Sequence, residues 1–273
     1  MSINLYGGAG LNLNSGTLFS DKILEKNNII ILVTGTTIEP WAQNWKECET
    51  TWIPELRKLG YTVMVAIGNP NLHSQWQIEG NMIWFKAEDT KRGLFDKSIA
   101  MPIDWILKET DYEYYFRIDS DSFVHPHRFD VMLRENLSDN ITHYMGCAHP
   151  AAMTNPYESF TYIVSKERTI ASGCGYMVSR PAMKVAQQKM RIDENVDYEI
   201  DDWVLGRAMW ENRVPLLHDS RIIFESKYNP LADDPFNIGL PYIGDAHSHL
   251  AIQHYMNGHM EEAMVSLGYR NNI

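Results

Sequence analysis

The stretch "YEYYFRIDSDSFV", from Tyr112 to Val124, joins an apolar run to two aspartates that stand one residue apart. The aromatic residues of the run predict a buried β-strand over residues 112–118. Asp119 and Asp121 follow directly at its carboxyl end. Carboxylates contribute nothing to apolar packing and are costly to bury, so the pattern indicates a functional site at the end of this strand.

Predicted strands and helices alternate on the N-terminal side of this stretch. Strands are expected over residues 29–33, 62–67 and 81–87, and helices over residues 41–59 and 94–110. This alternation is typical of an α/β fold with a mostly parallel central sheet flanked by helices. Ligands of such sheets bind outside the carboxyl ends of the strands, which is where the two aspartates stand.

The second half of the chain is less regular. Short strands are expected over 143–150 and 159–165, and the segment "SGCGY" (172–176) is interpreted as a glycine-rich turn. A helix should open near Ser179, because Pro181 suits its first turn. No internal repeat or linker interrupts the sequence. We therefore expect an N-terminal extension over 1–28 and one domain over 29–273.

The composition excludes several classes of protein. The 273 residues are 44% hydrophobic and include eight tryptophans, which favours a packed core over disorder. A net charge of −11 disfavours a broad grip on nucleic-acid phosphates. Three scattered cysteines form no disulfide framework, and neither a signal peptide nor a membrane span is evident. We expect a cytoplasmic protein of a bacterium or a virus-infected cell.

Asp119 and Asp121 are the first candidate site residues. Two carboxylates one residue apart on a turn can share a divalent cation, and hard oxygen ligands suit Mg²⁺ or Mn²⁺ better than zinc. Such a cation can hold a diphosphate and neutralise it as a leaving group. The alternative is that the Asp-Ser-Asp-Ser stretch only caps the following turn.

An acidic pair and a histidine pair are the other candidates. Asp201 and Asp202 begin a predicted helix, where they either stabilise its N-terminus or raise each other's pKa to give a general base. His247 and His249 would face the same way on an extended segment, as metal ligands often do, although a chain with ten histidines can contain such a pair by chance. His218 is a weaker candidate ligand. The chain has no fingerprint of a P-loop, a dinucleotide fold or a serine hydrolase.

The order of these segments resembles the fringe-type β-1,3-glycosyltransferases, which have the GT-A fold. The resemblance extends from about residue 28 to 250. It rests on the motifs Thr51-Trp52, "DSDSFV", "SGCGYMVS", "DDWVLG" and "HSHL". The chain has Ser120 where the family has the middle aspartate of a triplet, and its "HSHL" stands farther from the acidic pair.

The resemblance implies an inverting hexosyl- or pentosyltransferase that moves a sugar from a nucleotide donor, usually a UDP-sugar, with Mn²⁺ or Mg²⁺. The implied metal ligands are Asp119, Asp121 and His247 (or His249), and the implied base is Asp202. The implied donor-binding residues are Thr34, Thr36, Asp119, Ser120, Gly173 and Cys174.

Two other functions and several acceptors stay open. The chain could be a metal-dependent hydrolase that uses the histidine and acidic pairs, or a sugar- or nucleotide-binding module without activity. The acceptor hydroxyl could belong to a glycan, a protein or a hydroxylated DNA base of a virus. A local basic patch at Lys184, Lys189 and Arg191 would serve DNA despite the acidic total.

Overall fold

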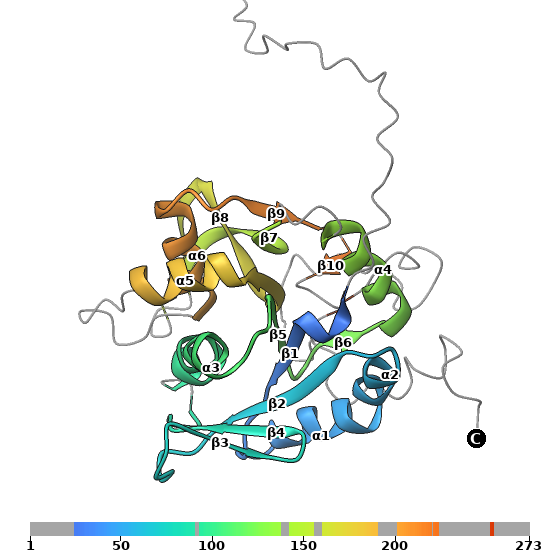
Figure 1. Cartoon of the computed structure of the whole chain (residues 1–273). Coiled ribbons are helices and arrows are strands. Elements are labelled where there is room, and N and C mark those ends of the chain that lie inside the picture. The colour runs from blue at the N-terminus through green and yellow to red at the C-terminus, as the bar shows by residue number, and fades with distance from the viewer. Residues whose placement is uncertain are drawn as a thin grey trace, which may run out of the picture.

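A mixed eight-stranded sheet, in the order β3-β4-β2-β1-β5-β8-β7-β9, forms the centre of the molecule (Figure 1). The computed structural model describes residues 25–90, 93–137, 142–155, 160–190, 201–219, 221–223 and 252–253. Strands β4, β2, β1 and β5 run parallel to one another, β8 and β3 are antiparallel to their neighbours in this group, and β9 is parallel to β7. The predicted α/β class with a mostly parallel central sheet is confirmed.

The strands of the large sheet have the following bounds: β1 Ile29–Thr34, β2 Thr62–Gly68, β3 Trp76–Glu79, β4 Met82–Phe85, β5 Tyr114–Asp119, β7 Tyr144–Asn155, β8 Phe160–Ser179 and β9 Leu216–His218. A second sheet of three short strands, in the order β10-β11-β6, contains β6 Phe123–Val124, β10 Ile222–Ile223 and β11 Ile252–Gln253. The predicted strands at 29–33, 62–67, 81–87 and 112–118 all exist, whereas the edge strand β3 was not predicted.

Helices cover both faces of the central sheet (Figure 1). On one side lie α1 Ala42–Thr50, α2 Trp52–Lys58 and α4 Pro126–Leu137; on the other lie α3 Met101–Glu109, α5 Arg180–Lys189 and α6 Asp201–Glu211. A short 3-10 helix, η1 Lys26–Asn28, precedes β1, and a π-helical turn, η2 Asp96–Ala100, precedes α3.

The sequence of β1 explains why it lies in the middle of the sheet. Ile29, Ile31 and Val33 pack in the core on the side of α1, α2 and α4, whereas Ile30 and Leu32 pack in the core on the opposite side. Every residue of the strand is buried. A strand covered on both faces needs apolar residues at consecutive positions, which is what the run "IIILV" supplies.

The single helix predicted over 41–59 is in fact two helices. They separate at Thr51, whose backbone (φ −112°, ψ −94°) is not helical. Pro54 follows in the first turn of α2. Proline lacks an amide hydrogen and its ring would clash with the carbonyl four residues earlier, so the helix restarts instead of continuing. The predicted stop at Gly60 is confirmed, with a φ of +95°.

The predicted turn at "SGCGY" is wrong. These residues lie within β8, which continues to Ser179, where the side chain caps α5 by accepting from the Ala182 amide. The register of β7 with β8 shifts between the pairs Gly146–Tyr176 and Ala148–Ala171, so the glycine segment forms an irregularity inside a strand. Glycine was interpreted as a chain reversal, but here it serves close approach to neighbouring side chains.

Candidate functional site

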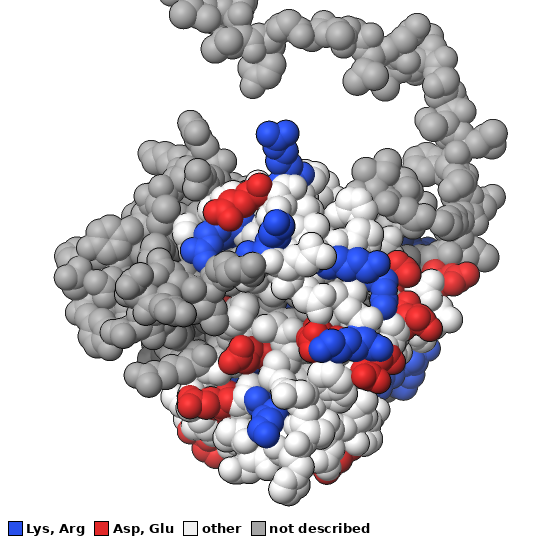
Figure 2. Space-filling view, turned by 60° about the vertical axis from the view of Figure 1, so that its left-hand side comes forward, with Lys and Arg blue, Asp and Glu red and all other residues white. Residues whose placement is uncertain are grey.

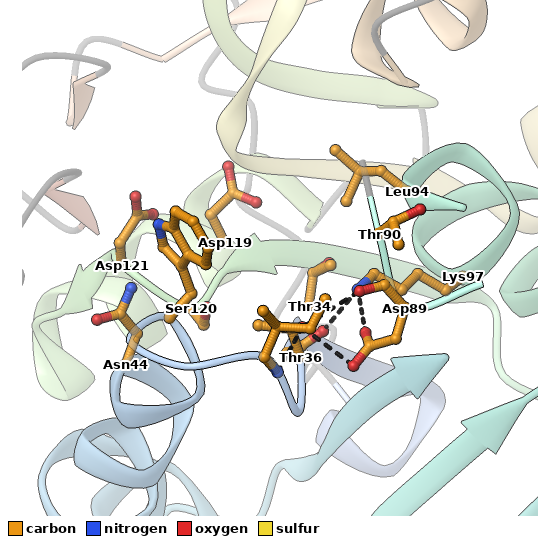
Figure 3. Close-up of a pocket in the computed structure, with 13 residues that line it drawn as sticks. Thr34, Thr36, Asn44, Asp89, Thr90, Leu94, Lys97, Asp119, Ser120 and Asp121 are labelled. Carbon is orange, nitrogen blue, oxygen red and sulfur yellow. Dashed lines mark hydrogen bonds and ion pairs between the residues drawn. The ribbon is translucent and has the colours of Figure 1, made fainter. Parts of the chain in front are cut away.

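A pocket of about 420 Å³ opens at the carboxyl ends of the parallel strands (Figure 3). Its wall comes mainly from the segments that follow β1, β4 and β5, with Asn44 of α1 and Lys97 of η2. Five of the predicted site residues line it: Thr34, Thr36, Asp119, Ser120 and Asp121. The chain thus brings the aspartates of one strand end together with the threonines of another, at the edge where α/β sheets bind ligands.

The turn after β5 holds the two aspartates in place. Asp119 ends the strand, and its carbonyl oxygen accepts a hydrogen bond from the Ser122 amide at 3.1 Å. The Ser122 hydroxyl donates to the Cys174 carbonyl of β8 at 3.0 Å, and the Cys48 thiol donates to the Ser120 carbonyl at 3.1 Å. The Cys48 side chain of α1 and the Cys174 carbonyl of β8 therefore hold this turn in place, and Figure 3 shows both carboxylates rising from it on the same side.

Behind Asp119 lies the buried guanidinium of Arg117, which is 1% exposed. Its Nη2 lies 2.7 Å from Asp119 Oδ1 and 2.9 Å from Asp201 Oδ2, and its Nη1 donates to the Gly173 carbonyl. Asp201 also accepts from the Ser98 hydroxyl at 2.8 Å. The Arg117 guanidinium thus joins the acidic turn of β5 to the first turn of α6.

Asp202 lies beside this group. Its carboxylate accepts from the Gly173 amide at 3.1 Å. Burial of the carboxyl group and the adjacent charge of Asp201, with a further contribution from Asp119, raise the pKa of Asp202 to about 7, against the opposing effects of Arg117 and of the Gly173 amide. A carboxylate with this pKa can take up a proton near neutral pH.

The opposite wall of the pocket contains a second ion pair that the sequence did not reveal. Lys97 of η2 is buried, and its Nζ lies 2.5 Å from Asp89 Oδ1 and 3.0 Å from the Gly35 carbonyl. The other oxygen of Asp89 accepts from the Thr36 hydroxyl at 3.0 Å and from the Thr37 amide and hydroxyl at 2.5 and 2.7 Å. Asp89 thereby ties the loop after β4 to the loop after β1. The segment "EDTKRGLFDKS" contains both residues, but nothing in it indicates their partners.

Two further features of the pocket favour a ligand. The Thr34 hydroxyl is buried and has no hydrogen-bond partner among the described residues. A buried hydroxyl is costly to leave without a partner, so a bound molecule would stabilise it. Trp41, which also lines the pocket, is 59% exposed. An exposed indole beside a pocket is suited to cover the ring of a ligand.

The residues present fit a hard divalent cation. Asp119 and Asp121 supply carboxylate oxygens on one pocket wall, and Mg²⁺ or Mn²⁺ in nucleotide sites is commonly held by one or two carboxylates together with substrate phosphates and water. No group of three potential metal-ligating side chains occurs within the described part of the chain. The predicted third ligand, His247 or His249, lies outside the described residues.

The other predicted site residues occupy varied positions. Gly173 lies against Arg117 and Asp119, whereas the Cys174 side chain is buried in the core on the side of α1, α2 and α4. His218 lies on β9 at the sheet edge, separated from β5 by β8 and β7, where its Nδ1 accepts from the Ala148 amide at 3.0 Å. The position of His218 gives it no contact with the pocket lining.

Neither family models nor curated protein sequences match the chain. Among solved structures it is similar to a glycosyltransferase involved in the glycosylation of the major capsid of PBCV-1, with a TM-score of 0.40 and 16% identity over 70% of this chain and 80% of that one. It is similar as well to 4-diphosphocytidyl-2C-methyl-D-erythritolsynthase from Anaerococcus prevotii DSM 20548, with a TM-score of 0.40 and 10% identity over 71% and 90% of the two chains. TM-scores this low establish no shared family, so the residues of the site carry the functional argument.

Only part of the predicted basic patch lies within the described residues. Lys184 and Lys189 are exposed on α5, and Arg191 lies outside the described residues. On the face shown in Figure 2, basic and acidic side chains are interspersed among uncharged ones instead of forming one basic area. Within the described residues no helix is long and apolar enough to span a membrane.

Proposed function

We propose that this chain is a metal-dependent, inverting glycosyltransferase of the GT-A type that uses a nucleotide-sugar donor, with a UDP-sugar as the first candidate. The observation that carries the proposal is that two pocket-lining carboxylates and a third carboxylate with a raised pKa lie close together at the end of β5. Asp119 and Asp121 line a pocket of the size of a small ligand, and Asp202, with a pKa of about 7, is joined to Asp119 through Gly173, just outside the pocket lining.

The pocket suits the donor in two parts. Thr34 at the end of β1 and Thr36 in the loop that follows supply hydroxyl groups for the polar edge of a nucleoside, and the Thr34 hydroxyl is buried. Asp119 and Asp121 would hold Mn²⁺ or Mg²⁺ against the diphosphate, and the bound cation would supply charge neutralisation for the departing nucleotide. Gly173 and Ser120, which adjoin the aspartates, are the nearest candidates to line the donor sugar.

The transfer requires a base on the side away from the leaving group. In the proposed reaction the acceptor oxygen forms a bond to the anomeric carbon while the bond from that carbon to the diphosphate oxygen breaks. The acceptor proton passes to the carboxylate of Asp202, and the nucleoside diphosphate leaves. A single displacement of this kind inverts the anomeric configuration, by the same geometric logic as in inverting glycosidases.

A donor screen tests this function. We expect the protein to release nucleoside diphosphate slowly from one or a few nucleotide sugars, and only in the presence of Mn²⁺ or Mg²⁺. Chelator-treated protein is the matched control, and addition of a suitable acceptor should accelerate the release. Metal-dependent hydrolysis of substrates without a nucleotide would indicate the hydrolase instead, and tight donor binding without turnover of any donor and acceptor would indicate a binding module.

The acceptor class follows from the same screen. Glycans, hydroxyl-bearing peptides and hydroxymethylated DNA would each be offered with the preferred donor. The net charge of −11 favours a glycan or peptide over DNA, because DNA binding depends on a basic surface. Transfer to hydroxymethylated DNA alone would reverse this order.

A further inference from the structure

Arg117 contacts both the acidic turn at the end of β5 and the first turn of α6. It lies on β5 two residues before Asp119, so both side chains leave the strand on the same face. Its guanidinium contacts Asp119 and Asp201 through Nη2, at 2.7 and 2.9 Å, and the Gly173 carbonyl through Nη1. The guanidinium lies over the ring of Tyr176, with 5.6 Å between the guanidinium carbon and the ring centroid.

The backbone of β8 is adapted to this guanidinium. A Cβ atom on Gly173 would lie 2.7 Å from Arg117 Nη1 and 3.0 Å from Asp119 Oδ2. Only glycine lets the strand pass this close without moving one of the two side chains. The same residue presents its amide to Asp202, so the position of Arg117, Asp119 and Asp202 depends on one short piece of backbone.

A guanidinium is well suited to hold Asp119, Asp201 and the Gly173 carbonyl together. Its nitrogen donors are fixed in one plane and can serve several acceptors at once, whereas a lysine ammonium has a single charged centre on a flexible stem. A buried ion pair is weak evidence for stability, because its desolvation offsets much of its attraction. Partners that orient metal-binding carboxylates, by contrast, strongly affect metal affinity.

We propose that Arg117 is a positioning residue of this site, which orients the carboxylate of Asp119 toward a divalent cation and fixes the first turn of α6 through Asp201. Arg117 itself touches neither cation nor substrate. The inference rests on the proposed function, since it assumes that Asp119 is a metal ligand. It adds that the geometry of the cation site depends on a residue outside the pocket lining.

The test measures Mn²⁺ affinity directly, by electron paramagnetic resonance of free Mn²⁺ without donor or acceptor. Arg117→Met, which keeps the length of the stem without the charge, should weaken Mn²⁺ binding about 10- to 100-fold, as loss of a partner of a metal ligand does. Arg117→Lys should restore only part of the affinity. Arg57→Met is the matched control, because Arg57 forms a bidentate ion pair with Glu49, at 2.7 and 2.8 Å, and neither residue lines the pocket.

A second variant approaches the same contact from the other side. Gly173→Ala places a methyl group against Arg117 and Asp119 and should also weaken Mn²⁺ binding, which keeps the test valid if Arg117→Met fails to fold. A purely structural role would lower the melting temperature in the Arg117 and Arg57 variants alike and leave Mn²⁺ affinity unchanged in every folded variant, and this result would overturn the inference alone. If the wild-type protein binds no Mn²⁺ even when UDP is present, the proposed function and the inference both fail.

Discussion

The two ion-paired clusters of the pocket differ in their balance of charge. On the wall formed by the loops after β1 and β4, the carboxylate of Asp89 meets the ammonium of Lys97 and three donors from two threonines. Near β5 and α6, the guanidinium of Arg117 faces both Asp119 and Asp201, and Asp202 adds a third carboxyl group. The first cluster is neutral, and the second has more negative than positive groups.

This difference appears in the pKa values of the carboxylates. Partial burial alone would raise the pKa of Asp89, but the hydrogen bonds from Lys97 and Thr37 outweigh it and lower that pKa. Burial and the charge of Asp201 raise the pKa of Asp202. A carboxylate with all its donors in place stabilises structure, whereas surplus negative charge attracts a cation or a proton. We therefore assign a structural role to the first cluster and a chemical role to the second.

The largest effect should come from Asp121→Ala. Loss of the Asp121 carboxylate, a proposed metal ligand, should abolish the Mn²⁺-dependent part of UDP binding. The fold should persist, because Asp121 follows β5 and does not pack within it. Titration calorimetry with UDP, with and without Mn²⁺, measures this effect. Asp89→Asn, which removes a carboxylate charge from the neutral cluster, should keep the Mn²⁺ dependence. Equal loss in both variants would remove the distinction between the clusters.

Asp202→Asn should retain donor and Mn²⁺ binding but lower the transfer rate roughly 10²- to 10⁴-fold, the usual contribution of a positioned base. Asp201→Asn should cost less in rate and more in stability, because the Asp201 carboxylate is held by Arg117 and Ser98. Transfer rates, donor affinities and urea unfolding are to be compared for the two variants. If the Asp202 variant keeps near-normal transfer and the Asp201 variant loses it, the base is Asp201 and not Asp202.

The pH dependence should follow Asp202. Transfer should rise as pH increases through about 7, because only the deprotonated carboxylate accepts a proton. Stability should change in the opposite direction: the folded state holds the proton more tightly than the unfolded chain, whose aspartates have a pKa of about 3.9. This contribution is full below about pH 4 and is lost as pH rises through about 7. Urea unfolding between these limits should show a weaker decline for Asp202→Asn; an identical decline in both proteins would contradict the assignment.

Loss of a charge from the neutral cluster of Asp89 and Lys97 should lower the free energy of unfolding. Lys97→Met leaves Asp89 partly buried without its cation, and loss of one member of a buried pair costs about 3 kcal/mol or more. The free energy of unfolding in urea measures this cost. Lys46→Met is the control, because its ion pair with Glu39 is exposed and should be worth less than about 1 kcal/mol. A small effect of Lys97→Met would show that the ion pair of Lys97 and Asp89 does not stabilise the loops after β1 and β4.

The sequence predicted local features better than long-range ones. The strand before Asp119 follows from its aromatic run, and the start of α5 follows from Ser179 and Pro181, because neighbouring residues determine both. The glycines at 172–176 were misinterpreted because a turn and a close approach require the same residue type. Whether glycine reverses the chain or makes room for Arg117 depends on a strand more than fifty residues away.

The same limit applies to the site. The carboxylates at 119, 121, 201 and 202 stand out in the sequence because each pair is close along the chain. Asp89, Lys97 and Arg117 do not, since each also binds a residue that is distant in the sequence: Thr36, Gly35 and Asp201, respectively. The prediction that Asp202 is a base stays a prediction, and so do the metal ligands, the donor-binding residues and the domain limits.

The smallest effect expected concerns Trp41. Its indole lines the pocket and is 59% exposed, so its replacement should leave stability nearly unchanged. Stacking of an aromatic side chain on a base contributes about 1–3 kcal/mol, and Trp41→Ala should therefore weaken UDP binding about tenfold. Trp41→Phe should recover most of the affinity, and Trp76→Ala on the edge strand β3 is the matched control.

The Trp41 variant also separates the two functions assigned to the pocket. Because the indole carries no charge, Mn²⁺ affinity should be the same in wild type and Trp41→Ala, unlike in Asp121→Ala. Affinity for uridine, which lacks phosphates, should fall by the same factor as affinity for UDP if the indole covers the base. If only the complete nucleotide sugar binds more weakly, Trp41 covers the sugar instead, and the base must lie toward the wall held by Asp89 and Lys97.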